Sequence, residues 1–85
     1  MYTVTFKASA LKELNDLNIK DVKRIMEKIT ALEEEPRPVN CKKLKGSNQN
    51  LYRIRISDYR VIYSIDDGIK VVSIRDVGNR KDIYN

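Results

Sequence analysis

The chain has 85 residues and a net charge of +5, with 34% charged and 41% hydrophobic residues, which is typical of one small globular domain spanning residues 1–85. No stretch approaches the roughly 18 apolar residues of a membrane span, the N-terminus has no signal-peptide pattern, and the single cysteine, Cys41, suits a reducing cytoplasm. Because histidine is absent, the usual zinc sites are excluded. A single cysteine cannot form an internal disulfide, and no cofactor is expected.

The N-terminal part of the chain predicts one strand followed by two helices. Residues 2–6 alternate strictly between apolar and polar side chains and predict a strand. Ser9 is expected to cap a short helix over residues 10–17, and a longer helix is expected over residues 20–34. The apolar side chains of the longer helix recur at helical spacing and predict a buried face formed by Val22, Ile25, Met26, Ile29 and Leu32.

The middle of the chain predicts an extended link and a basic loop. Residues 36–38 read Pro-Arg-Pro, which prevents the helix from continuing. The segment 41–50, CKKLKGSNQN, is basic at first and then rich in turn-forming residues, so a loop is expected there. Its lysines, Lys42, Lys43 and Lys45, are either ordinary loop lysines or contacts to a polyanion.

The stretch 51–65, LYRIRISDYRVIYSI, predicts a β-hairpin with Ser57 and Asp58 at its turn. That turn places Arg55 directly opposite Arg60, and the tyrosines, isoleucines and valines then share the other face. Like charges that face each other across a strand pair destabilise it, so this arrangement indicates a surface that concentrates positive charge for an anion. The residues expected on that surface are Arg53, Arg55 and Arg60.

A second turn signal predicts a further strand over residues 69–77. If Asp67 and Gly68 form a two-residue turn, Arg75 lies opposite Arg60 and extends the arginine row to a third strand. A three-residue loop would instead turn Arg75 to the other face. Beyond this strand, Arg80 and Tyr84 stand in a segment too short for a packed helix, and both can fold back over the sheet edge.

The predicted order is strand–helix–helix–strand–strand–strand, an α+β fold in which a helical hairpin packs on one face of an antiparallel sheet. The arginines then lie on the open face. Residues 1–40 hold seven basic and seven acidic side chains, whereas residues 41–85 hold ten basic and five acidic ones. The positive excess therefore accompanies the open face, which indicates a polyanionic partner, nucleic acid before membrane.

Catalytic Ser–His, Cys–His and paired-carboxylate patterns are absent from the sequence, so arginine, lysine and tyrosine are the groups available. These groups suit metal-free cleavage of RNA, in which the adjacent 2′-hydroxyl is the nucleophile and the protein stabilises the developing charge. Guanidinium groups clamp phosphate, and an aromatic ring can stack on a base. Arginine stays protonated near neutral pH and is a poor general base, so the proton acceptor is not identified.

Two segments, KKLKGSNQNLYRIRISDYRVIY and VVSIRDVGNRKDIY, resemble the RelE toxins of bacterial and archaeal toxin–antitoxin pairs. They match a run found in the RelE/ParE superfamily: K-L-[KR]-G, Y-[KR]-[IL]-[KR], Y-R-[VIL]-x-Y and V-G-x-R…Y. The resemblance implies a RelE-like fold over nearly the whole chain. It also implies a metal-independent endoribonuclease that cuts messenger RNA in the ribosomal A site. A cognate antitoxin is implied to inhibit this enzyme, and oligomers are expected to form only through that antitoxin.

The resemblance implies roles for single residues as well. Arg60 is implied to be the principal phosphate clamp, Arg80 to stabilise the leaving 5′-oxygen, and Tyr84 to stack on or orient a base. Arg53 and Arg55 occupy two basic positions where the best-known RelE has lysines, which weakens any scheme with a lysine base. The implied catalytic set is thus Arg53, Arg55, Arg60, Arg80 and Tyr84, and the expected RNA-binding set is Lys42, Lys43, Lys45 and Arg75.

Two other functions stay open at this point. One is a ParE-like protein that inhibits DNA gyrase without being an enzyme. The other is an inactive homologue that still binds its antitoxin. For single residues, the alternative is that Arg53 and Arg55 are solvated surface residues and that Tyr84 is a plug at the edge of the core. Asn79 stands where many relatives have histidine, so histidine-dependent acid–base catalysis is not expected.

Overall fold

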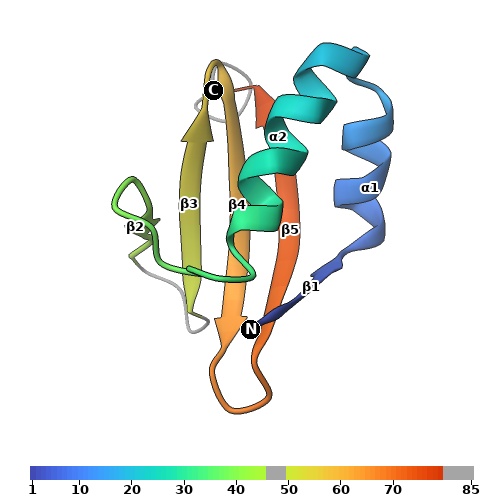
Figure 1. The fold of residues 1–85 in the computed structure, drawn as a ribbon. Coiled ribbons are helices and arrows are strands. Elements are labelled where there is room, and N and C mark those ends of the chain that lie inside the picture. Colours follow the sequence, from blue (N-terminus) through green and yellow to red (C-terminus); the bar gives the residue numbers. More distant parts are fainter. Residues whose placement is uncertain (46–49, 80–85) are drawn as a thin grey trace.

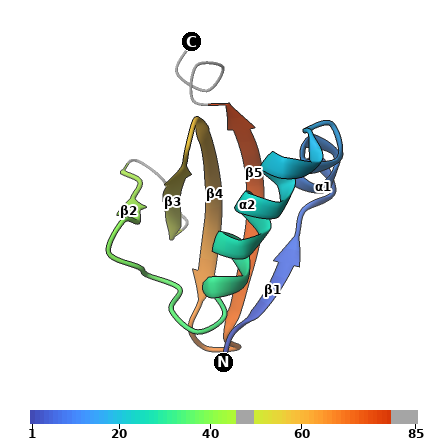
Figure 2. The same ribbon diagram turned by 45° about the horizontal axis from the view of Figure 1, so that its top comes forward.

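The computed structural model describes residues 1–45 and 50–79. Two helices lie on one face of a five-stranded sheet (Figures 1 and 2). The elements follow in the order β1 (Thr3–Phe6), α1 (Ala8–Asn15), α2 (Ile19–Ala31), β2 (Lys42–Lys43), β3 (Leu51–Ile56), β4 (Tyr59–Asp66) and β5 (Val71–Asn79). The predicted α+β fold is therefore confirmed. Neither helix is long and apolar enough to cross a membrane.

The sheet differs from the predicted one at both edges, because its strand order is β1-β5-β4-β3-β2. An antiparallel sheet was predicted, but β1 runs parallel to β5, with Thr3 opposite Val71, so the sheet is mixed. At the other edge, Lys42 and Lys43 form the short strand β2 beside β3, where a loop was predicted. A two-residue strand is too short to show an alternating pattern in the sequence.

Both helices lie close to their predicted positions but begin at other residues. The side chain of Asn18 caps α2, because its Oδ1 accepts a hydrogen bond of 3.0 Å from the backbone N–H of Asp21. The residue that precedes α1 is Lys7, which makes no side-chain cap. Ser9, the predicted cap, lies inside the helix. The helices bury Ala10 and Leu14 from α1 and Ile25 and Ile29 from α2.

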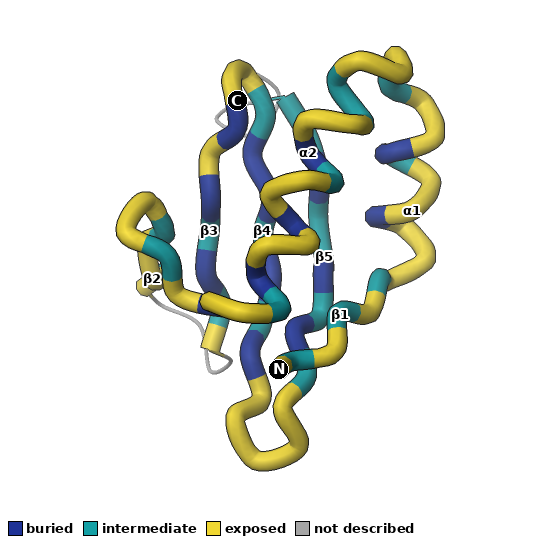
Figure 3. Tube along the Cα trace, viewed as in Figure 1, coloured by how far each residue is buried: buried dark blue, intermediate teal, exposed yellow. Residues whose placement is uncertain are grey.

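The core lies between the helices and the sheet (Figure 3). The apolar face predicted for the hairpin supplies much of it, including Tyr52, Ile54, Val61 and Tyr63. The rings of Tyr52 and Tyr63 stack with 5.9 Å between their centroids. The Tyr63 hydroxyl donates a hydrogen bond of 2.8 Å to the carbonyl oxygen of Pro36, and burial raises its pKa.

A cluster that we call the Arg37 clamp ties the β4–β5 turn to the rest of the fold. Arg37 binds both carboxylate oxygens of Asp67, at 2.8 and 3.2 Å, and its Nε donates to the Tyr52 hydroxyl at 3.2 Å. Its guanidinium also lies 5.2 Å from the Tyr52 ring centroid. The Tyr2 hydroxyl donates to Asp67 at 2.7 Å. The bonds from Arg37, and then that from Tyr2, lower the pKa of Asp67.

Candidate nucleic-acid interface

The β3–β4 hairpin has the register predicted from its sequence. Arg55 lies directly opposite Arg60, and Ser57 and Asp58 form the turn between the strands. Ser57 has a φ of 53°, and a positive φ at the first central position is what a type II′ hairpin turn requires. The prediction that two arginines face each other across this hairpin is confirmed.

The tip of the hairpin is bonded to α2. The Tyr59 hydroxyl donates a hydrogen bond of 2.8 Å to Oδ2 of Asp21, and this bond raises the pKa of Tyr59. Next to it, Nη1 of Arg24 donates to Oγ of Ser57 at 2.6 Å. These bonds hold the arginine-bearing strands against a helix, so the arginines stand on a supported element and not on a loop.

The open face of the sheet gathers four cationic side chains. Residues opposite each other on neighbouring strands point to the same side, so Lys42, which pairs with Arg53, lies on the same face as Arg53. We call this surface the cationic face and define it by Lys42, Arg53, Arg55 and Arg60. Lys43 pairs with Tyr52 and therefore lies on the other face. Lys45 is exposed beyond β2.

Arg60 is the most deeply placed cation of this face. It lies on β4 between β3 and β5, and its residue is only 8% exposed, whereas Arg55 is exposed and Arg53 half-buried. Its partner on β5 is Gly78, which brings no side chain to the face. A guanidinium held this deep has few rotamers open to it and is oriented before a ligand arrives.

Arg75 does not occupy its predicted place opposite Arg60. Four residues, 67–70, join β4 to β5 where a two-residue turn was predicted. Oδ1 of Asp66 holds this longer turn, accepting hydrogen bonds from the backbone N–H groups of Gly68 at 2.9 Å and Ile69 at 3.2 Å. An irregularity in the β4–β5 pairing then shifts the register further along the strands. The predicted pairing of Arg75 with Arg60 was therefore wrong.

Arg75 still faces the open side, together with Ser73 two residues before it on β5, and lines a hollow there. Arg80 and Tyr84 lie outside the described residues, so their roles stay predictions. Within residues 1–45 and 50–79, no group of three or more His, Cys, Asp or Glu side chains is placed to hold a metal ion.

One titratable pair was missed by sequence reasoning, because it joins residues of α1 and β5. Burial, followed by the hydrogen bond with Asp76, raises the pKa of Glu13 to about 7. Glu13 also lines a cavity of about 300 Å³ with Tyr59, Gly78 and Asn79. Neither carboxyl is among the four cationic residues that define the cationic face.

Three comparisons place the chain among known proteins. Residues 4–84 match the family described as ParE toxin of type II toxin–antitoxin system, parDE. The candidate toxin RelE1 of Methanocaldococcus jannaschii is 33% identical over 86 residues, which cover 98% of this chain and 94% of RelE1.

Solved structures give the same picture. A chain of the archaeal RelE–RelB complex from Pyrococcus horikoshii has a TM-score of 0.83 and 36% identity, with 93% of this chain and 94% of that chain covered. The isolated RelE toxin of E. coli has a TM-score of 0.81 and 31% identity, with 99% and 92% covered.

Proposed function

This chain belongs to the RelE/ParE family of toxins of type II toxin–antitoxin systems, and we propose that it is an endoribonuclease that cuts messenger RNA in the ribosomal A site. The observation that carries the proposal is the placement of Arg55 opposite Arg60 on the open face of the sheet, next to the pair of Lys42 and Arg53. Four cations on neighbouring strands suit a chain of phosphates.

The proposed reaction needs charge stabilisation more than it needs a nucleophile from the protein. The 2′-hydroxyl of the RNA loses its proton to water and its oxygen forms a bond to the adjacent phosphorus. The bond from phosphorus to the 5′-oxygen breaks, and that oxygen takes up a proton from water. Arg60 and Arg55 would bind the phosphoryl oxygens as their negative charge grows. Arg80 would stabilise the leaving oxygen, and Tyr84 would hold a base so that attack proceeds in line.

We propose that cleavage depends on the ribosome. The cationic face offers many groups for phosphate and few for the edges of bases, so it binds an RNA backbone without fixing one conformation of it. A free messenger is flexible, and attack by the 2′-hydroxyl requires a defined in-line geometry. The ribosome would supply that geometry by holding the codon in the A site.

We also propose a cognate antitoxin as the physiological partner in the cytoplasm. Structures from P. horikoshii, E. coli and Mycobacterium tuberculosis are described as complexes of RelE with RelB or as RelBE toxin–antitoxin complexes. For this chain, an antitoxin segment carrying acidic side chains would neutralise the toxin by lying across the cationic face or by displacing the C-terminal residues.

The matched family bears the ParE name, which favours a second candidate function, inhibition of DNA gyrase. Primer extension on a messenger, with ribosomes present and absent, separates the two functions when it is run beside a gyrase supercoiling assay. We expect cuts within A-site codons only when ribosomes are present, and unchanged supercoiling. Intact messenger together with blocked supercoiling would favour gyrase inhibition, and no effect in either assay would indicate an inactive antitoxin-binding homologue.

A further inference from the structure

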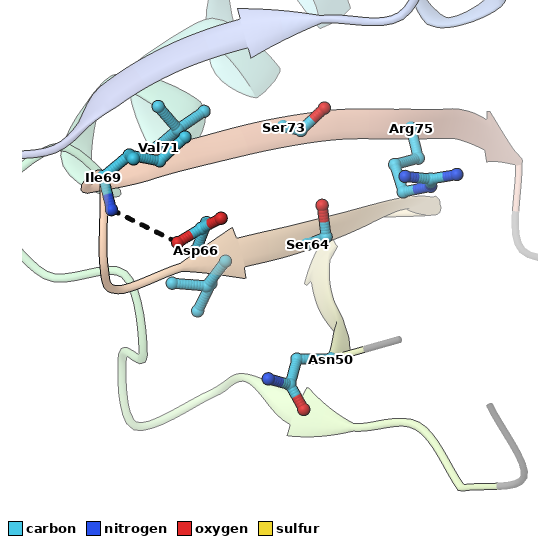
Figure 4. A pocket seen from close by; sticks show the side chains of 8 residues that line it. Asn50, Ser64, Asp66, Ile69, Val71, Ser73 and Arg75 are labelled. Carbon is cyan, nitrogen blue, oxygen red and sulfur yellow. Dashed lines mark hydrogen bonds between the residues drawn. The ribbon is translucent and has the colours of Figure 1, made fainter. Parts of the chain in front are cut away.

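A hollow of about 360 Å³ lies on the open face of the sheet, at the end away from the β3–β4 turn (Figure 4). Its floor is made by Ser64 of β4 and Ser73 of β5, which lie directly opposite each other. Figure 4 shows Arg75 beyond Ser73 at one end and Asp66 at the other. Asn50 stands at the side, and Val71 adds an apolar surface. We call this the serine hollow.

The serine hollow continues the cationic face along the same strands. Ser64 follows Arg60 by four residues on β4, so both side chains point to the same side of the sheet. At roughly 3.4 Å per residue, the two positions are separated by about 14 Å. A strand of RNA that follows β4 away from the cationic face would reach this hollow.

The side chains of the hollow suit a neutral polar group. Each serine hydroxyl is both a donor and an acceptor, and an amide such as that of Asn50 offers both functions too. Among the described residues, the side chains of Ser64, Ser73 and Arg75 make no hydrogen bond with one another or with their neighbours. Their hydrogen-bonding groups are thus available to a ligand.

The opposite charges at the two ends of the hollow determine the orientation of a bound ligand. The Asp66 carboxylate is held in place by the backbone N–H groups of Gly68 and Ile69, so a negative charge is fixed at the far end. A phosphate is repelled there and attracted to Arg75 at the near end. The arrangement fits a nucleotide whose phosphate is near Arg75 and whose uncharged base enters the hollow.

We propose that the serine hollow binds one unpaired base of the RNA whose backbone lies on the cationic face. Ser64, Ser73 and Asn50 would bond to the polar edge of the base, and the planar guanidinium of Arg75 would stack on it or hold its phosphate. This inference rests on the proposed function, since it assumes an RNA ligand. It adds a place where the identity of a base affects binding.

The test measures binding and not cleavage. A labelled RNA of seven nucleotides with 2′-O-methyl groups, which lack the nucleophilic hydroxyl, is titrated with the full chain by fluorescence anisotropy. A series in which each position in turn is abasic follows. We expect the parent to lose roughly fivefold to tenfold in affinity when one particular base is missing, as for the loss of a stacked or hydrogen-bonded base.

Two variants and one control assign that loss to the hollow. Ser73→Leu fills the hollow. This variant should bind the intact RNA only as tightly as the parent protein binds the abasic RNA, and removal of the base should cause no further loss of its affinity. The double change Ser64→Ala and Ser73→Ala removes only the hydroxyls and should show a smaller loss of the same kind. Thr30→Leu adds similar bulk on an exposed position of α2 and should bind as the parent does. Thermal unfolding of each protein confirms that it is folded.

The inference is overturned if the parent binds every abasic RNA as tightly as the intact one. It is also overturned if folded Ser73→Leu and the double alanine variant still distinguish the abasic RNA as the parent does. A chain that shows the expected binding but leaves messenger intact on ribosomes refutes the proposed cleavage alone. A chain that cuts messenger but is indifferent to the base refutes the serine hollow alone.

Discussion

Arg37 and Arg60 lie toward opposite ends of the sheet and place the same functional group in opposite surroundings. Arg37 is bound to both oxygens of Asp67 and to the Tyr52 hydroxyl, so the chain itself supplies its anion. Arg60 is buried and lies opposite another cation, Arg55. The first arrangement joins distant segments of the fold, whereas the second concentrates charge at a destabilising site. Burial and the charge of the facing group, and not residue type, therefore separate a structural arginine from a candidate catalytic one.

The largest change is expected for Arg60→Ala. We expect the rate of messenger cleavage to fall by about 10²- to 10³-fold, because one preoriented donor to the transition state is lost. The free energy of unfolding should change little or increase, because Arg55 loses the like charge opposite it. Single-turnover cleavage on programmed ribosomes and thermal unfolding measure the two effects. Cleavage at the parent rate by folded Arg60→Ala would show that the cationic face is not the active site.

Arg37→Ala should give the opposite result. We expect a melting temperature a few degrees below that of the parent at neutral pH, because the Arg37 clamp is lost, and an unchanged cleavage rate below that temperature. Lys12→Ala removes a positive charge from an exposed position of α1 and is the matched control. A large loss of cleavage rate in folded Arg37→Ala would contradict the division between the two arginines.

The ion pair between Arg37 and Asp67 also predicts how the melting temperature depends on pH in the acid range. The pKa of Asp67 in the folded protein is below its ordinary value of 3.8, with Arg37 as the main cause. The stabilisation that this carboxylate provides is therefore complete above pH 3.8 and is lost as the pH falls through the lowered pKa. The difference in melting temperature between the parent and Arg37→Ala should shrink over that range, and a constant difference would argue against the ion pair.

Lys42→Ala compared with Lys43→Ala gives a smaller effect on the side of the cationic face. The two lysines are neighbours in sequence, but Lys42 pairs with Arg53 on the open face and Lys43 pairs with Tyr52 on the other. Lys42→Ala should weaken RNA binding a few-fold and reduce the salt dependence by about one unit of slope, as for one phosphate contact. Lys43→Ala should change both less. Equal effects in a salt titration would mean that the face does not decide RNA contact.

A still smaller effect is expected at Glu13, a carboxyl of α1 that meets the like charge of Asp76 on β5. Its pKa in the folded protein is raised to about 7 from an ordinary value of 4.5, by burial first and by Asp76 second. Stability from this group is therefore complete below pH 4.5 and decreases as the pH rises toward 7. Glu13→Gln should remove this part of the pH dependence of the melting temperature, while Glu27→Gln, on an exposed position, should keep it.

The hairpin could be predicted from sequence because two local signals agreed. Its strands alternate regularly, and the two residues between them are turn formers, so the pairing of Arg55 with Arg60 followed. The length of the β4–β5 turn was predicted wrongly, because Asp67 and Gly68 resemble the central residues of a two-residue turn. In the structure, Asp66 accepts hydrogen bonds from backbone N–H groups and stabilises a turn of four residues. The irregular pairing further along β4 and β5 cannot be recognised from the alternation of apolar and polar residues.

The parts of the site that escaped prediction depend on contacts between distant segments. Lys42 joined the cationic face only through a two-residue strand pairing with β3. The Arg37 clamp brings Tyr2 to Asp67 across 65 positions of sequence, and no local pattern indicates such a pair. By contrast, Arg53 and Arg60 were placed on one face by strand alternation together with the turn at Ser57 and Asp58, and both signals are local.

The parallel pairing of β1 with β5 has a consequence for the order of events during protein synthesis. β1 contains Thr3 and Val4, yet its partners Val71 and Val72 are each translated 68 residues later. A nascent chain that stops before β5 lacks both the neighbour of β1 and the third strand beside Arg60. Contacts this far apart in sequence form late in folding. The strand β4, which carries Arg60, therefore gains its second neighbour in the sheet only after β5 has been synthesised.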